Sequence, residues 1–406
     1  MSQAALGRAG AVHGALRALT VEGLRLFFPL GALYAMLMPL VWVAVYRFEL
    51  PLARAIPATQ WHAHEMVFGV LCAVLAGFLT SAVPEWTDTA RRRGRALGLL
   101  AALWLPGRLI GLLGADALVV PALLTDAAFL GLLLWYAAEP MIAKRSARHV
   151  SLPAWLAVLL ACEIAVRIGW LAGDWAIAAR ALHAAVCAFV VLFALALGRI
   201  NVAVLNLALD PSGETTPYRP HPGRQNLAAG MVALYIVAAT FAPQSAVAAW
   251  LALAAAAAFL DRLAEWFVGR AALAAHVLAL AAANALAAAG FAAIGLAGLG
   301  APIGLAAGMH VLTVGALGLA VLSVFSIAGL RHTGRTLVLP WQARAALALV
   351  MLAAAARVVP GLFGLASATG SHYLLAALAW SVAFAVWLHG YLPYFLAPAA
   401  PARDRC

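Results

Sequence analysis

Charged side chains are scarce in this chain, since Asp, Glu, Lys and Arg make up only 10% of its 406 residues. Hydrophobic residues make up 66%, and the mean hydropathy is +0.98. A soluble domain carries about 25% charged residues. The shortage of charge excludes an ordinary soluble globular protein and, with the long apolar runs, predicts a polytopic membrane protein.

Several chemical motifs are also absent. The sequence has no P-loop, no glycine fingerprint for a dinucleotide, and no CxxCH motif for covalent haem attachment, so any haem would be bound non-covalently. The four cysteines, of which three lie in apolar runs, form no CxxC pair, and we expect them to fill the core. They are Cys72, Cys162, Cys187 and Cys406.

The apolar runs predict an all-α helix bundle, because a backbone in lipid satisfies its own hydrogen bonds only as a helix or a closed barrel. We expect a single 12-helix domain over residues 26–397, preceded by an amphipathic cytoplasmic N-terminus (1–25) and followed by a cytoplasmic tail (398–406). The predicted spans are 26–46, 62–83, 96–114, 117–139, 153–173, 176–206, 227–243, 246–266, 271–298, 301–330, 341–366 and 373–397.

The net charge of +11 is distributed by topology. Basic clusters precede the first predicted span and follow the even-numbered spans, so nearly all of them fall on one side. By the positive-inside rule this side is the cytoplasm, which also places both termini there. The positive charge therefore predicts contact with a lipid bilayer and gives no support to a nucleic-acid partner.

The stretch "TQWHAHEMVFG" opens the second predicted span with His62, His64 and Glu65. We expect Thr59 to be the N-cap, and a helix N-terminus disfavours a positive imidazolium, so both rings are expected to be neutral and able to bind a metal. Residues two apart point about 200° apart around a helix, whereas His62 and Glu65 share a face. Either the first turn is irregular, or the two rings serve different sites, such as a haem iron and a second metal or a haem propionate.

Other histidines lie within or at the ends of spans, where ionisable groups are expensive. His310 lies in the tenth span in "GLAAGMHVLTVGALG", whose glycines would let another helix or a flat macrocycle approach the backbone. His276 in the ninth span and His332 at the end of the tenth lie toward the cytoplasmic side and could meet each other. The length of the ninth span leaves open a deeper position for His276.

Charged residues of both signs also fall within or at the ends of spans. Their arginines could bind haem propionates, because a guanidinium matches a carboxylate at two points. Internal salt bridges and snorkelling to the membrane surface are the alternatives. The arginines are Arg108, Arg167, Arg199 and Arg357, and the acids are Asp126 and Glu163.

Three blocks of this sequence resemble, in the same order, the signature blocks of the NnrS family. They are "WHAHEMVFGVLCAVLAGFLTSAVPEWT" (61–87), "GMHVLTVGALG" (308–318) and "LRHTGRTL" (330–337). The resemblance covers essentially the whole chain. It implies a bacterial inner-membrane protein that contains haem and copper, is linked to nitric oxide and denitrification, and protects against nitrosative stress.

The resemblance also implies a set of site residues. The family's histidines match His62, His64, His310 and His332, with Glu65 beside the first pair and His276 on the ninth span. A family segment after the sixth span survives as Gly198 and Arg199 in "LGRINVAVLN", and the aromatic residues that usually follow the ninth-span histidine are missing. The implied cofactors are a non-covalent b-type haem and copper, and the implied cofactor-binding residues are His62, His64, Glu65, Arg199 and His310.

Three classes of function fit these features. In the first, a haem or haem-copper redox protein binds or transforms nitric oxide, with a quinol or cytochrome as electron donor, as in a nitric oxide reductase. In the second, the histidines are transient ligands in a transporter or a carrier of metal or haem. In the third, they are packing residues of an assembly factor for a respiratory complex. We expect the first, on the strength of the histidines and the resemblance together.

Overall fold

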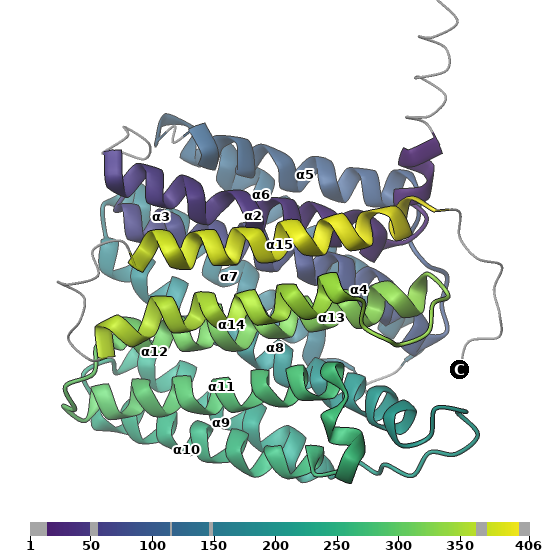
Figure 1. The fold of residues 1–406 in the computed structure, drawn as a ribbon. Coiled ribbons are helices and arrows are strands. Elements are labelled where there is room, and N and C mark those ends of the chain that lie inside the picture. Colours follow the sequence, from purple (N-terminus) through teal and green to yellow (C-terminus); the bar gives the residue numbers. More distant parts are fainter. Residues whose placement is uncertain (1–13, 49–55, 114–115, 146–148, 363–371, 398–406) are drawn as a thin grey trace, which may run out of the picture. The chain divides into compact units, whose positions relative to one another are not determined.

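The computed structural model describes residues 14–48, 56–113, 116–145, 149–362 and 372–397. Within these ranges every regular element is a helix (Figure 1), so the all-α prediction is confirmed for the described part of the chain. The chain divides into two compact units. Unit 1 comprises Met1–Gly173, Phe325–Gln342 and Phe384–Cys406, and unit 2 comprises Asp174–Val324 and Ala343–Ala383.

Eleven helical segments in the described ranges are long and apolar enough to cross a membrane, one fewer than the twelve predicted. The predicted span 227–243 corresponds to α9 (Pro222–Phe241), which is a helix but is not among these eleven. The first turns of α9 contain Arg224, Gln225 and Asn226, so its apolar stretch begins only at Leu227. Because this apolar stretch is short, α9 is not among the helices that are long and apolar enough to cross a membrane. The chain is a multi-pass membrane protein.

Unit 1 contains the first five membrane-length segments. Consecutive helices α5, α6 and α7 pack in sequence order, and α2 packs on α4. Its helices and short turns are α2 (Gly23–Phe48), α3 (Ala58–His64), η1 (Glu65–Leu71), α4 (Cys72–Thr87), α5 (Arg95–Leu113), η2 (Asp116–Leu118), α6 (Val119–Ala143) and α7 (Ser151–Ala172).

Unit 2 begins with the longest helix, α8, whose N-cap residue Asp174 accepts hydrogen bonds from the backbone N–H groups of Ala176 and Ile177. Helices α9, α10 and α11 then lie side by side (Figure 1). The elements up to the tenth predicted span are α8 (Trp175–Leu209), α9, α10 (Ala246–Arg262), η3 (Leu263–Trp266), η4 (Gly269–Leu273), α11 (Ala275–Gly298), α12 (Leu305–His310) and η5 (Val311–Leu317).

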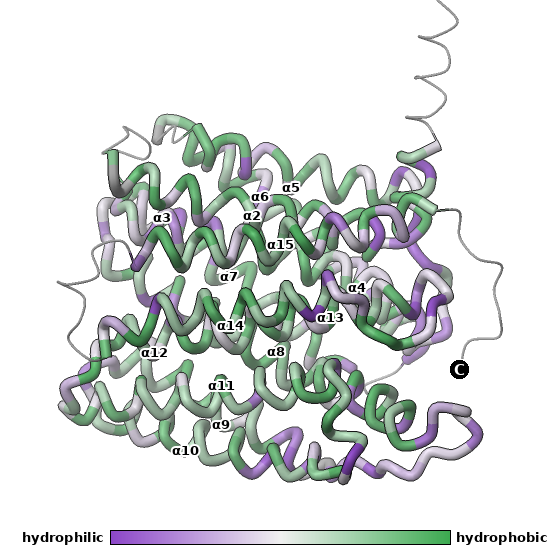
Figure 2. The backbone as a smooth tube through the Cα atoms, in the orientation of Figure 1, coloured by the Kyte–Doolittle hydropathy of each residue, from purple (hydrophilic) through white to green (hydrophobic). Residues whose placement is uncertain are grey.

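Three further helices contribute to both units. Helix α13 (Gly318–His332) begins in unit 2 and ends in unit 1, and α14 (Trp341–Leu362) lies almost entirely in unit 2. Helix α15 (His372–Leu396) begins in unit 2 and ends in unit 1. Apolar residues dominate these helices as they do the others, and hydrophilic residues gather mainly in loops and at helix ends (Figure 2).

Two spans are interrupted in the same way. The second span runs from Ala58 to Thr87 as α3, η1 and α4, and the tenth runs from Leu305 to His332 as α12, η5 and α13. Both η1 and η5 are seven-residue π-helical segments, and each follows directly after a histidine, His64 or His310. Insertions of this kind are rare and are frequent at functional sites. Glycine lies five residues after each histidine, at Gly69 and Gly315.

Candidate functional site

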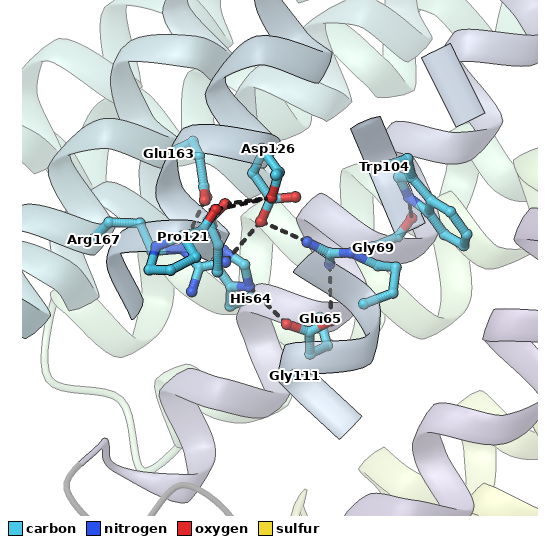
Figure 3. A network of polar contacts seen from close by, with 12 residues as sticks. His64, Glu65, Gly69, Trp104, Gly111, Pro121, Asp126, Glu163 and Arg167 are labelled. Atoms are coloured by element: carbon cyan, nitrogen blue, oxygen red, sulfur yellow. Dashed lines mark hydrogen bonds and ion pairs between the residues drawn. The ribbon is translucent and has the colours of Figure 1, made fainter. Parts of the chain in front are cut away.

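His64 is completely buried in unit 1, and both of its ring nitrogens contact carboxylates (Figure 3). Nδ1 lies 3.0 Å from Oε1 of Glu65, and Nε2 lies 2.8 Å from Oε2 of Glu163 on α7. Carboxylates accept hydrogen bonds, so this geometry uses both nitrogens as donors and leaves no lone pair for a metal. The ring is therefore placed as an imidazolium, which differs from the neutral ring expected at a helix start.

Two arginines complete the buried network. Arg108 on α5 donates from Nη1 to Glu65 (2.8 Å) and from Nη2 to Asp126 on α6 (2.6 Å). Arg167 donates to the same oxygen of Asp126 (2.7 Å) and to Glu163 (2.8 Å). Internal ion pairs are thus the arrangement found for Arg108 and Arg167, whose guanidinium groups are not free for haem propionates.

Glycines on α5 make room for these carboxylates. A Cβ atom at Gly107 would collide with Oδ1 of Asp126, and one at Gly111 would lie 2.6 Å from Oε1 of Glu65. The two glycines are four residues apart and share one face of the helix. Any larger residue at either position would displace an ion-pairing carboxylate.

The buried charges balance without a bound cation. Glu65, Asp126 and Glu163 carry three negative charges, and Arg108, Arg167 and an imidazolium at His64 carry three positive charges. Ligand atoms of His64, Asp126 and Glu163 do lie within 4.8 Å of one another, which is close enough for a metal site. However, both nitrogens of His64 are engaged and two guanidinium groups contact Asp126. The residues present do not fit a metal at His64.

Two further expectations concern the start of the second span. Thr59 was expected to cap the helix, but α3 begins at Ala58 after Pro57 and has no side-chain cap. The ring of His62 stacks on Trp42, with centroids 4.8 Å apart, and does not share the carboxylates of His64. An irregular first turn was one of the two alternatives, but α3 is a regular α-helix through His64, and the π-helical η1 begins only at Glu65.

His310 in unit 2 differs from His64 because only one of its ring nitrogens has a hydrogen-bond partner in the described part of the chain. Its Nδ1 lies 2.6 Å from the backbone carbonyl oxygen of Ala306, which can only accept a hydrogen bond. Nδ1 therefore carries the hydrogen, and in the neutral ring Nε2 holds a lone pair. A hydrogen bond from one ring nitrogen to a carbonyl is the usual support for a metal-ligating histidine. The half-buried His310 fits a haem iron or another metal.

The remaining predicted residues are divided between the units. His276 lies in the first turn of α11, because that helix begins only at Ala275, so it does not reach the deeper position that a longer span allowed. Its Nε2 is buried without a hydrogen-bond partner. His332 belongs to unit 1, where Nδ1 lies 2.8 Å from Oε1 of Glu22. Arg199 is half-buried on α8 of unit 2.

Sequence reasoning missed Tyr34 and Trp104. The hydroxyl of Tyr34 on α2 donates to Oε2 of Glu65, and Nε1 of Trp104 donates to the carbonyl of Gly69 within η1 (3.0 Å). Both are aromatic residues in long apolar spans, where a packing role is the ordinary expectation. The sequence carries no signal that would have separated them from other core aromatics.

Comparison with known proteins identifies the family. The model of the NnrS protein family matches residues 18–399 of the chain. No curated protein and no solved structure is significantly similar to it. Because the match spans nearly all of the chain, it confirms the resemblance of the three sequence blocks. The chain belongs to the NnrS family.

Proposed function

We propose that this protein is a haem-binding redox protein of the bacterial cytoplasmic membrane that acts in nitric oxide metabolism or the relief of nitrosative stress. Family membership supports the connection with nitric oxide. The observation that carries the haem proposal is the tautomer of His310, whose Nδ1 is held by the Ala306 carbonyl. Nε2 is the ring atom available to an iron.

The chain's own residues prepare this ligand. The carbonyl of Ala306 fixes the ring orientation and keeps the hydrogen on Nδ1. The π-helical segment that follows begins at Val311, so the backbone changes its winding directly after the ligand. Gly308 allows close approach to α11, because a Cβ atom there would lie 2.8 Å from Cγ1 of Ile294. Haem held at Nε2 would supply one-electron chemistry and an open position for a gas.

Copper is the second cofactor that we propose, with His276 as its histidine. Its buried Nε2 has no hydrogen-bond partner, and a buried polar atom of this kind needs a ligand or water. Within the described ranges, His276 belongs to no cluster of three or more His, Cys, Asp or Glu ligand atoms. His276 is therefore the side chain that we expect to bind copper.

The electron donor that we propose is a membrane quinol or a cytochrome. The chain has no dinucleotide-binding fingerprint, and a haem iron exchanges electrons one at a time. Either donor is present at a bacterial cytoplasmic membrane. Turnover of nitric oxide, as in a nitric oxide reductase, would need this electron supply.

The proposal is tested on protein purified from haem-replete cells, by ultraviolet-visible spectroscopy, pyridine haemochrome analysis and metal analysis. We expect a Soret band that shifts when nitric oxide is added to the reduced protein. His310→Ala should lose the band, whereas His389→Ala, which changes an exposed histidine of α15, should keep it. A colourless, metal-free wild-type protein would refute the proposal. Weakly held haem that moves across proteoliposome membranes would favour a carrier instead.

A further inference from the structure

An arginine paired with a tyrosine occurs both in the network of His64 in unit 1 and in unit 2, which contains His310, but only unit 1 supplies a carboxylate to that pair. In unit 1, Arg108 on the following span and Tyr34 meet at Glu65, and the guanidinium carbon of Arg108 lies 6.0 Å from the centre of the Tyr34 ring. The Glu65 carboxylate thus joins a histidine, an arginine and a tyrosine. All three donate to one anionic group.

In unit 2, Arg357 on α14 and Tyr373 on α15 form the corresponding pair. The guanidinium carbon of Arg357 lies 4.6 Å from the centre of the Tyr373 ring, and the charge of Arg357 acts electrostatically on His310. The residue after His310, at the position of Glu65, is Val311. The histidine, the arginine and the tyrosine are present, but the carboxylate is not.

The packing of α13, α14 and α15 places His310, Arg357 and Tyr373 at a similar depth along the helices. A Cβ atom at Gly318 would lie 3.3 Å from Cγ1 of Val350 on α14 and would also collide with Trp380 on α15. His310 precedes Gly318 by eight residues, and Arg357 follows Val350 by seven on the antiparallel helix. Tyr373 precedes Trp380 by seven. These steps move along the helices by about 10–12 Å in the same direction, so the three side chains lie at a similar depth.

Acidic side chains are missing from this part of the sequence. Residues 266–403 contain no Asp and no Glu. The acids of unit 2 all lie earlier, and four of them have local contacts: Asp174 with the backbone of Ala176 and Ile177, Asp210 with Ser212 and Thr215, Asp261 with Arg224, and Glu265 with Arg262. Arg357 makes no hydrogen bond and no ion pair with the described residues. A guanidinium in a membrane-length helix, half-buried and without a counter-charge, is energetically unfavourable unless a ligand or the membrane surface compensates it.

We propose that Arg357, beside His310 and Tyr373, binds a planar carboxylate-type anion supplied by a ligand, in place of the carboxylate that Glu65 supplies in unit 1. A guanidinium offers parallel N–H donors that match the two oxygens of such an anion. Two sources share this chemistry, namely a propionate of bound haem and a small free anion such as formate or nitrite. The first source rests on the proposed function, and the second does not.

Two experiments test this proposal. The first, called the haem arm, measures the rate at which haem leaves the protein for an apo-globin acceptor. Arg357→Gln should release haem at least about tenfold faster, because a charge-assisted hydrogen-bonded pair is lost. Its Soret position should be unchanged, since the proposed iron ligand is intact. Arg357→Lys keeps the charge but not the planar fork, so its rate should fall between those of the wild type and Arg357→Gln. Arg344→Gln, on the same helix, is the control.

The anion arm uses the protein without haem and follows its thermal unfolding by tryptophan fluorescence. Sodium formate or sodium nitrite should raise Tm saturably in the wild type and in Arg344→Gln but not in Arg357→Gln, with sodium chloride as the ionic-strength control. A positive haem arm identifies the propionate, and a positive anion arm identifies a free ligand. Size-exclusion chromatography first establishes that Arg357→Gln is folded. If the folded variant then shows the same haem release rate and the same anion-dependent Tm as Arg344→Gln, Arg357 only extends to the membrane surface and the proposal is wrong. A protein without haem would refute the proposed function while leaving the anion arm decisive.

Discussion

His64 and Glu163 form an ion pair at 2.8 Å between side chains that are fully shielded from solvent. They come from α3 and α7, so the pair joins the second and fifth membrane-length segments of unit 1. A buried charge without its partner is strongly destabilising, and each end of this pair has a second partner, Glu65 or Arg167. The pair therefore explains how ionisable groups persist inside so apolar a protein.

Glu163→Gln tests the strength of this network. The substitution removes one negative charge and leaves a buried excess of positive charge on His64 and Arg167, so it should destabilise the protein by about 3–5 kcal/mol. The measurement is equilibrium or thermal unfolding in detergent. Glu139→Gln breaks a partly exposed pair with Arg92 and should cost no more than about 1 kcal/mol. Equal effects of the two substitutions would contradict a closed buried network.

His64→Gln and His310→Ala separate an ion-pairing histidine from a metal-binding one. Because both nitrogens of His64 are used by carboxylates, His64→Gln should lower stability but keep the haem content of the folded fraction. His310→Ala should remove the haem with a smaller loss of stability, since its ring has one hydrogen bond to the backbone. Haem per folded molecule and Tm are measured on the same samples. Loss of the Soret band in folded His64→Gln would show that His64 binds the iron.

Gly111→Ala tests the space beside Glu65. The added methyl group would lie 2.6 Å from Oε1 and should displace the carboxylate, which costs about 1–3 kcal/mol. Gly98→Ala on the same helix is the matched control, because nothing lies within 4 Å of a Cβ atom there. The control should be neutral or slightly stabilising, as alanine favours a helix. Unfolding midpoints of the two variants decide the comparison, and an unchanged midpoint in Gly111→Ala would mean that Glu65 moves freely.

Tyr218 predicts a loss of stability at high pH. It lies between α8 and α9, where burial and the neighbouring charge of Glu265 raise its pKa to about 12. The folded state therefore keeps the phenolic proton after the unfolded chain, with an ordinary pKa of about 10, has lost it. The stabilisation is fully present below pH 10 and disappears as the pH rises toward 12.

The experiment compares the wild type with Tyr218→Phe between pH 9 and 12, using Tm and tyrosinate absorbance. The wild type should lose stability relative to the variant across this range, and the difference in absorbance should titrate near pH 12. A titration midpoint near 10 would show that the hydroxyl is solvated. Phenylalanine keeps the ring, so the comparison isolates the hydroxyl group.

Much of the fold follows from local sequence. Membrane-length helices are predictable because the backbone of an apolar run in lipid must form all of its hydrogen bonds within the protein. Eleven of the predicted spans correspond to helices that are long and apolar enough to cross a membrane. The twelfth predicted span corresponds to α9, which is less apolar because polar residues occupy its first turns, so a twelfth membrane crossing stays a prediction. The π-helical segments could not be located, because their winding depends on packing around His64 and His310 and leaves no composition of its own.

The candidate residues themselves were also readable from the sequence, since ionisable side chains stand out in apolar runs. Their roles were not. Whether Arg108 and Arg167 pair with acids or remain open to propionates depends on Asp126 and Glu163, which approach them from other helices. The sequence determined a multi-pass helical protein of the NnrS family. Only the tertiary structure decided that His64 is surrounded by carboxylates while His310 keeps a nitrogen available, because partners distant in the chain set the charge around each ring.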